Sequence, residues 1–119
     1  MRDLRERDLW RSTILICTGE FGRAAVSKPA EGRDHGPTGF SVWLGGGPIA
    51  GGAIIGDTGD GSPEPSDPVT VPDLFATLLT AMGLDPATEN LAPGGRPVKL
   101  GEGTPVTRLL TPAAIGRRR

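Results

Sequence analysis

The sequence is short of the residues that most often carry chemistry or fill a core. It has one cysteine, one histidine and no tyrosine, and aromatic residues make up only 4% of its 119 residues. Because Cys17 is alone, an internal disulfide and a cysteine-based zinc site are excluded. No stretch approaches the roughly 18 apolar residues that a membrane-spanning helix needs, and no apolar segment follows the charged N-terminus as in a secretion signal. As written, the chain is expected to be cytoplasmic, without a membrane partner.

Basic residues are also scarce between the two ends of the chain. Residues 12–116 contain six Lys or Arg residues against eleven Asp or Glu residues. A nucleic-acid-binding surface requires clustered basic side chains, so nucleic acid is not expected as a partner. Residues 117–119 are three arginines. We interpret them as a solvated basic tail that follows a single domain over residues 1–116.

Glycine and proline, in contrast, are abundant. The chain has 19 glycines and 12 prolines, together about a quarter of all residues, which approaches the level of disordered chains. Leu, Ile, Val and Phe nevertheless make up more than about a fifth of the sequence, and the net charge is only -1. These values favour one small globular domain that is rich in loops.

Short apolar runs predict the strands of this domain. Residues 13–18 form a nearly uninterrupted apolar and β-branched run, which is typical of a strand covered on both faces of a parallel sheet. Residues 40–44 indicate a second strand, and residues 53–55 a third extended piece. Residues 57–68 are expected to form a polar surface loop. We therefore expect an α/β fold with parallel strands.

One segment has clear helical periodicity. The apolar residues between Val71 and Met82 recur at the spacing of an amphipathic helix, with Thr70 as an N-cap and Gly83 as a left-handed stop. Weaker patterns predict a surface helix over residues 2–11, an extended piece over residues 97–100 and a helical turn over residues 104–110.

The loop of residues 19–39 contains the candidate functional residues. Glu20 follows the first predicted strand after Gly19, where open α/β sheets place their sites, and His35 follows Asp34. Carboxylate and imidazole groups are suitable ligands of divalent metals, although these three residues are fewer than a complete site requires. The pattern alone also permits the alternative in which Glu20 is an ordinary loop acid and His35 a surface residue.

Two other motifs are interpreted as structural. Gly45, Gly46 and Gly47 lack the spacing of a phosphate-binding loop and predict a turn. The aspartates of the polar loop, Asp57, Asp60 and Asp67, do not have the spacing of a calcium-binding loop.

Taken together, four segments resemble a known family. They are residues 13–23 (TILICTGEFGR), 32–35 (GRDH), 43–47 (WLGGG) and 72–79 (PDLFATLL). In this order they are similar to the C-terminal part of the domain of unknown function 1501 proteins, which themselves resemble sulfatases of the alkaline phosphatase superfamily. The resemblance implies the C-terminal portion of a mixed sheet flanked by helices, with other strands missing. It also implies longer relatives that resemble exported proteins.

The resemblance implies a function as well, namely metal-dependent hydrolysis of an anionic phosphate or sulfate ester. Glu20, Asp34 and His35 would bind the divalent metal, which would be zinc, manganese or calcium. Arg23 and Arg33 would contact the anionic oxygens of the substrate, unless both arginines pair with loop acids. Phe21 stands where the superfamily has a metal-binding histidine, so it cannot be a ligand. No residue matches the superfamily's nucleophile.

The sequence thus leaves two functional hypotheses. In the first, the chain contributes residues to the metal site of a hydrolase-like protein and is inactive alone. In the second, it is a non-catalytic structural or protein-binding module. An incomplete sheet would leave apolar surface exposed, so self-association is expected.

Overall fold

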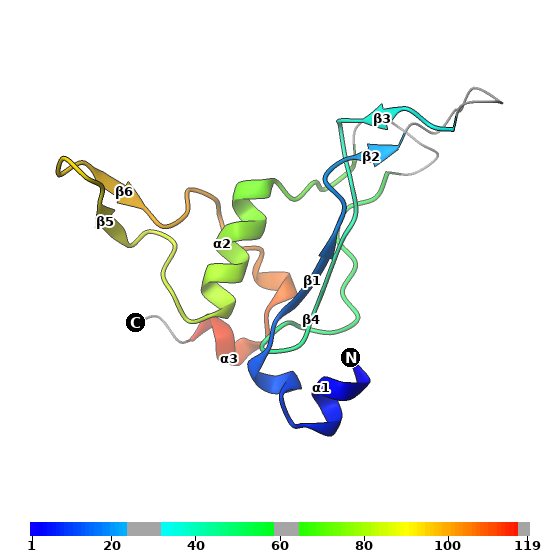
Figure 1. Cartoon of the computed structure of the whole chain (residues 1–119), viewed down its shortest axis with the longest axis horizontal. Helices are drawn as coiled ribbons and strands as arrows, with labels where there is room; N and C mark the ends of the chain where they lie inside the picture. The colour runs from blue at the N-terminus through cyan, green and yellow to red at the C-terminus, as the bar shows by residue number, and fades with distance from the viewer. Residues whose placement is uncertain (24–31, 59–64, 117–119) are drawn as a thin grey trace. The chain divides into compact units, whose positions relative to one another are not determined.

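The computed structural model describes residues 1–23, 32–58 and 65–116 (Figure 1). The chain divides into two compact units. We call residues 15–44 and 54–68 the ribbon unit, and residues 1–14, 45–53 and 69–119 the helical unit. Short helices and two-stranded sheets make the protein a mixed α/β structure, which confirms the predicted class. Within the described residues, no helix has the length and apolar character needed to cross a bilayer.

The ribbon unit contains two pairs of short strands. Strand β1 (Leu15–Thr18) pairs with β4 (Val42–Gly45), and β2 (Gly22–Arg23) pairs with β3 (His35–Gly36). The β2–β3 pair is antiparallel, and Figure 1 shows β4 returning beside β1 in the opposite direction. The predictions of strands at residues 13–18 and 40–44 are therefore confirmed. The prediction of parallel strands is wrong for the described residues, because each strand pairs with one antiparallel neighbour.

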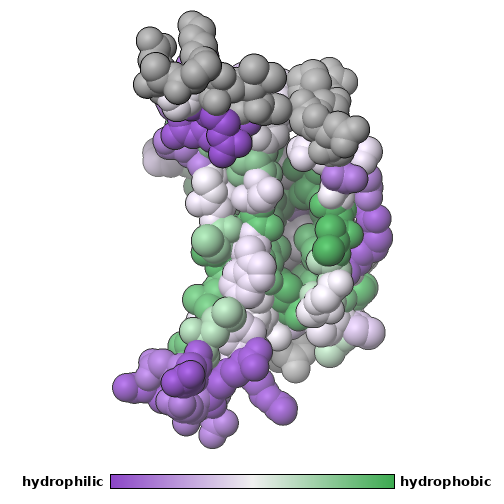
Figure 2. Space-filling view, turned by 90° about the vertical axis from the view of Figure 1, so that its right-hand side faces the viewer, coloured by the Kyte–Doolittle hydropathy of each residue, from purple (hydrophilic) through white to green (hydrophobic). Residues whose placement is uncertain are grey.

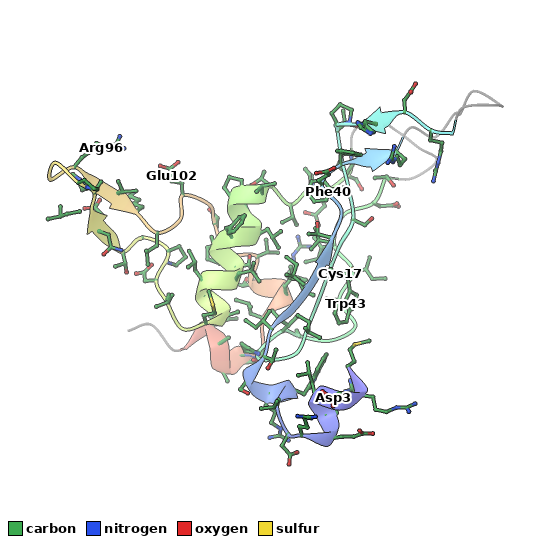
Figure 3. All side chains as sticks on the ribbon, viewed as in Figure 1. Asp3, Cys17, Phe40, Trp43, Arg96 and Glu102 are labelled. Carbon is green, nitrogen blue, oxygen red and sulfur yellow. The ribbon has the colours of Figure 1, made fainter. Side chains whose placement is uncertain are left out.

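The first strand is not covered on both faces, as its apolar sequence had suggested. Ile16 is 45% exposed, Cys17 is exposed, and Trp43 on β4 is 44% exposed. Figure 3 shows the side chains of Cys17, Phe40 and Trp43 along this ribbon. A two-stranded ribbon has too few neighbouring strands or helices to bury its side chains. The apolar sequence of β1 therefore did not predict its burial correctly.

The segment after β4 is less regular than predicted. Residues 53–55 form no strand, and Ile54 is 94% exposed. The polar loop is closed instead by two backbone hydrogen bonds, from Asp57 N–H to Ser66 O (3.2 Å) and from Ser66 N–H to Asp57 O (2.8 Å). Asp60 and residues 117–119 lie outside the described residues.

Helix α2 (Val71–Ala81) is the main element of the helical unit and confirms the prediction from periodicity. Its N-cap is Thr70, whose Oγ1 accepts a hydrogen bond from Asp73 N–H at 3.2 Å. Its C-terminal stop is Gly83, which has a φ of 83°. Local sequence signals were sufficient to locate both ends of this helix.

The remaining elements of the helical unit are short. Helix α1 (Arg2–Glu6) and a 3₁₀ helix (Trp10–Ser12) replace the single helix predicted over residues 2–11. Strand β6 (Pro97–Lys99) matches the extended piece predicted at residues 97–100, and it pairs in antiparallel register with β5 (Glu89–Leu91), which was not predicted. A second 3₁₀ helix (Thr107–Leu109) confirms the turn near residues 104–110, and helix α3 (Pro112–Ile115) follows.

The core of the helical unit is small. Among the described residues, the buried hydrophobic side chains are those of Ile49, Ala76, Leu110 and Ala114. Ile49 and Leu110 form an antiparallel β-bridge, and α2 packs against α3. Thr77 is the buried polar residue of α2; its hydroxyl donates to Asp73 O (2.6 Å) and accepts from Val106 N–H (2.8 Å). The hydrogen bond from Val106 N–H fixes the segment after β6 against α2.

Candidate functional site

The β2–β3 pair brings together the two segments that contain the candidate site residues. Arg23 lies directly opposite His35, and Gly22 lies opposite Gly36. Residues 24–31, which connect the two strands, are not described. Glu20 lies just before β2, while Arg33 and Asp34 lie just before β3. The predicted site residues therefore gather at one end of the ribbon unit, although they come from two segments of the chain.

Gly22 is required for this close approach of the two segments. A Cβ atom at position 22 would collide with Gly39 O and would lie 3.2 Å from Gly36 O. No side chain fits in this space, which explains why the residue between Phe21 and Arg23 is a glycine.

The aromatic ring of Phe21 is the centre of the side-chain contacts here. Its centroid lies 3.8 Å from that of the His35 ring, and the two planes are inclined by 30°. The Arg23 guanidinium carbon lies 5.2 Å from the centroid of the Phe21 ring, within the range of a cation–π contact. Arg23 also donates a hydrogen bond from Nη1 to Arg33 O at 3.1 Å. One aromatic ring is thus in contact with both the imidazole and a guanidinium group.

The spacing of these residues explains the contacts. Phe21 is at a bend immediately before β2, two residues from Arg23. His35 lies opposite Arg23 and is therefore a diagonal neighbour of Phe21. Diagonal pairs on one face of an antiparallel ladder are within reach of aromatic side chains. Sequence analysis did not identify Phe21 as part of the site, because the register between the two segments was not predictable.

All five predicted site residues are exposed: Glu20, Arg23, Arg33, Asp34 and His35. Within the described part of the chain, neither Glu20 nor Asp34 forms an ion pair with Arg23 or Arg33. The alternative in which these two arginines are neutralised by these two acids is therefore not observed. The charged groups remain accessible to a ligand.

The donor atoms near β2 and β3 are of the types that divalent metals bind, but they do not form a complete site. Over residues 1–23, 32–58 and 65–116, no group of three or more His, Cys, Asp or Glu side chains lies close enough to hold a metal ion. A catalytic zinc site takes at least three protein ligands. The described residues by themselves therefore do not fit a resident metal.

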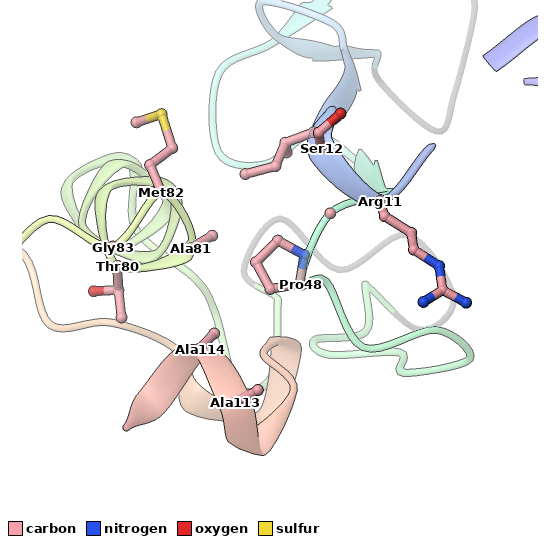
Figure 4. A pocket seen from close by; sticks show the side chains of 11 residues that line it. Arg11, Ser12, Pro48, Thr80, Ala81, Met82, Gly83, Ala113 and Ala114 are labelled. Atoms are coloured by element: carbon pink, nitrogen blue, oxygen red, sulfur yellow. The ribbon is translucent and has the colours of Figure 1, made fainter. Parts of the chain in front are cut away.

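The helical unit has a separate hollow of about 670 Å³ between the C-terminal end of α2, α3 and the segments near residues 11–14 and 47–48 (Figure 4). None of the five predicted site residues lines it. The Thr80 hydroxyl donates to Ala76 O, and the Ser12 hydroxyl donates to Leu9 O. Figure 4 shows the Arg11 side chain extending away from α2. The protons of the Ser12 and Thr80 hydroxyls that line this hollow are therefore donated within the chain.

A second hollow, of about 370 Å³, lies on the β5–β6 hairpin. Its charged lining includes Arg96 and Glu102, which are labelled in Figure 3, together with Glu89 and Lys99 on the two paired strands. Both signs of charge are represented equally among these four residues.

Gly45 is the last residue of β4, and the predicted turn follows it at Gly46 and Gly47. Gly46 and Gly47 have φ values of 78° and 52°. The Gly47 N–H donates to Trp10 O at 2.8 Å, so this amide is occupied by the chain itself.

Comparison with known proteins gives one match. A family model described as "Protein of unknown function (DUF1501)" matches residues 1–110. No curated protein and no solved structure matches the chain. The match includes all the candidate site residues and helix α2.

Proposed function

Since the chain belongs to the DUF1501 family of proteins of unknown function, we propose that it supplies part of the site of a metal-dependent hydrolase of phosphate or sulfate esters. The observation that carries this proposal is the β2–β3 ladder, which aligns Arg23 with His35 and so joins the two candidate segments. The candidate ligands of the divalent metal are Glu20, Asp34 and His35, which the described structure does not bring together as one set of three. The residues assigned to the ester oxygens are Arg23 and Arg33.

Two features of the described residues support this assignment. Carboxylates and a neutral imidazole are suitable ligands for zinc or manganese, and all three side chains are accessible. The guanidinium group of Arg23 is fixed by its hydrogen bond to Arg33 O and retains further N–H donors for an anion.

The described residues supply fewer metal ligands than a complete site needs. The described residues do not gather three ligands, so further ligands and the nucleophile have to come from protein outside these residues. The chain is accordingly proposed to be a contributor to the site and inactive alone.

Calorimetric titration tests the metal assignment. Zinc, manganese and calcium are titrated separately into the 119-residue chain at high protein concentration, because a partial donor set binds weakly. We expect His35→Ala and Glu20→Ala each to lower the affinity for the preferred metal by at least about tenfold. Glu102→Ala, an exposed acid of the helical unit, is the matched control and is expected to have no effect. Equal affinities for all four proteins would contradict the assignment of His35 and Glu20 as ligands.

A second candidate function, a structural or protein-binding module, is favoured by a different observation. On α2, Phe75 is 59% exposed and Val71 is 49% exposed, and the C-cap residue Met82 is 59% exposed. Figure 2 shows hydrophobic residues at the surface of the face that it presents. Exposed apolar residues in such number are typical of a surface that binds other protein. The two functions are compatible, because a contributor to a larger site must also dock onto the protein that completes it.

A further inference from the structure

The register of the β5–β6 hairpin decides which backbone groups of β5 face its partner strand. In an antiparallel pair, the N–H and C=O groups of successive residues point alternately toward the neighbouring strand and away from it. The Ala92 N–H donates to Arg96 O at 2.9 Å, and the Leu100 N–H donates to Thr88 O at 2.9 Å. Asn90, midway between Thr88 and Ala92, therefore also turns its backbone groups toward β6.

Glu89 and Leu91 consequently point their N–H and C=O groups away from the hairpin. In the part of the chain that the structure describes, these groups have no hydrogen-bond partner. Leu91 is 76% exposed, and Glu89 and Asn90 are also exposed. Figure 1 shows the hairpin extending to one side of α2. The outer edge of β5 is thus open to another extended strand.

The outer edge of β6 is protected in a way that the edge of β5 is not. The outward residues of β6 are Pro97 and Lys99, which lie opposite Leu91 and Glu89. Proline has no N–H to offer to a further strand, and natural proteins use proline and lysine to block exposed edges. Both outward residues of β5 keep their N–H groups. Of the two edges of this hairpin, β5 is therefore the one suited to pairing.

The residues that flank this edge limit its length to residues 89–91. The Ala87 N–H already donates to a carboxylate of the same loop at 2.9 Å, and Pro93 has no N–H. If two copies of β5 meet in antiparallel direction, one register lets both outward residues form all their hydrogen bonds. In this register Glu89 of each copy lies opposite Leu91 of the other, and the two-fold axis passes through Asn90.

The side chains are complementary in the same register. Like charges directly opposite each other destabilise a sheet, whereas unlike charges stabilise it. Each Glu89 lies between Lys99 of its own hairpin and Leu91 of the second copy, so no two carboxylates are directly opposite. The two Asn90 side chains meet on the other face of the sheet. A carboxamide has both a donor and an acceptor, so it can bond to its own copy.

We infer that β5 is an interface between two copies of this chain, which pair through residues 89–91 into a four-stranded antiparallel sheet of order β6–β5–β5–β6. The inference rests on the protein-binding function, for which it names a second copy as the partner, and it is independent of the metal site. The β5 edge is also a separate surface from the exposed Phe75 of α2. A three-residue edge is a small contact, so the dimer is expected at high protein concentration.

Disulfide trapping tests the register. In the inferred sheet the two Asn90 residues lie opposite each other without sharing a backbone hydrogen bond. Such pairs are about 4.5 Å apart at Cα, within the range of roughly 4.4–6.8 Å that a disulfide spans. In a Cys17→Ser background, which removes the native thiol, we expect Asn90→Cys to form a disulfide-linked dimer in glutathione buffer.

Val98→Cys in the same background is the matched control for the disulfide. Val98 lies opposite Asn90 within the hairpin and shares its face, but β5 separates it from the second copy. We expect little disulfide-linked dimer from this variant. Equal yields from Asn90→Cys and Val98→Cys would overturn the inference, because random collisions would then account for both.

Proline substitution tests the edge without a cross-link. Leu91→Pro removes an outward N–H from β5 and none of the hydrogen bonds of the hairpin. In sedimentation equilibrium, we expect it to raise the dimer dissociation constant by about tenfold, since one hydrogen bond is lost from each copy. Lys99→Pro removes the corresponding N–H from β6 and is expected to leave the constant unchanged. Equal constants for the two variants, or a parent chain that is monomeric throughout, would contradict the β5 interface.

Phe75→Asp separates this inference from association through α2. We expect the Asn90→Cys dimer to form equally well when Phe75→Asp is added. Loss of the cross-link in that double variant would show that α2 holds the copies together, and the inference would be wrong. If Phe75→Asp leaves association unchanged while Leu91→Pro weakens it, binding through α2 is wrong and the β5 interface stands.

Discussion

At the scale of single residues, Asp73 shows how one side chain joins two parts of the helical unit. Its Oδ2 accepts a hydrogen bond from the Thr70 hydroxyl at 2.6 Å, and its Oδ1 accepts one from Thr104 N–H at 2.7 Å. The hydrogen bond from Thr70, followed by the one from Thr104, holds the pKa of the Asp73 carboxyl below its ordinary value. The negative charge also lies in the first turn of α2, where the helix dipole favours it.

This lowered pKa predicts an acid-sensitive part of the stability. Because the pKa of Asp73 is lower in the folded than in the unfolded state, the ionised carboxylate stabilises the fold above the unfolded pKa, about 3.9. That contribution is lost as the pH falls through the folded pKa. In urea unfolding at pH 7, 5 and 3, we expect Asp73→Asn to lower the midpoint at pH 7 and to make its decrease toward pH 3 shallower. Glu102→Gln is the control. An Asp73→Asn protein with the parent's pH dependence would contradict this linkage.

Gly46, like Gly22, lies where the chain leaves no room for a Cβ atom. Its φ is 78°, and a Cβ atom there would collide with Thr13 O and lie 3.1 Å from Trp10 O. The glycine therefore serves both the left-handed backbone and the close approach to residues 10–13.

A comparison of Gly46 with Gly52 separates the cost of the positive φ from the cost of the collision. Gly52 has a similar φ of 80°, but a Cβ atom there would meet nothing within 4 Å. Gly52→Ala is expected to lower the free energy of unfolding by about 1 kcal/mol, the conformational cost alone. We expect Gly46→Ala to cost more than about 2 kcal/mol, because the strained φ and the collision add. Chemical denaturation measures both, and equal losses would show that the collision at Gly46 is relieved without cost.

At the scale of elements, the accuracy of the sequence predictions follows the range of the interactions. Helix α2 was located within one residue of its predicted limits, because its cap, its period and its glycine stop all lie within the segment itself. Strands β1 and β4 were also located, since both are short apolar runs. Their pairing was predicted incorrectly, because a strand's own residues do not specify which neighbour it meets or in which direction.

The candidate site shows the same limit. Glu20, Arg23, Arg33, Asp34 and His35 were identified as candidates from residue type and family resemblance. The structure adds that Arg23 lies opposite His35 and that Phe21 contacts both. Phe21 was noted only as a residue that cannot bind metal. Its contact with the His35 ring joins two segments of the chain and depends on the register of β2 and β3, which composition does not specify.

At the scale of the whole molecule, few side chains are buried for the length of the chain. The described residues bury four hydrophobic side chains, whereas fifteen large hydrophobic ones are exposed, among them Leu91 at 76% and Ile54 at 94%. A domain of this size ordinarily buries most of its large apolar groups. Hydrophobic burial of this extent is small against the entropy cost of ordering the chain, so contact with other protein is expected to stabilise the fold.

Association of the chain is therefore a prediction at this scale. In sedimentation velocity, we expect the 119-residue protein to form oligomers whose proportion rises with concentration. Phe75→Asp removes an exposed apolar group from α2 and is expected to shift the protein toward the monomer. Thr88→Asp, at an exposed position outside α2, adds the same charge and serves as the control. A monomer at all concentrations for the unmodified chain would count against the protein-binding function.

By itself, the sequence determined the mixed α/β class and the position of α2, because both depend on residues near one another in the chain. Only the tertiary structure decided that β1 is exposed, that the strands are antiparallel and that Phe21, Arg23 and His35 share one face. These properties depend on which segments meet. The pairing of strands depends on contacts between residues that are far apart in the chain, so no local pattern specifies it.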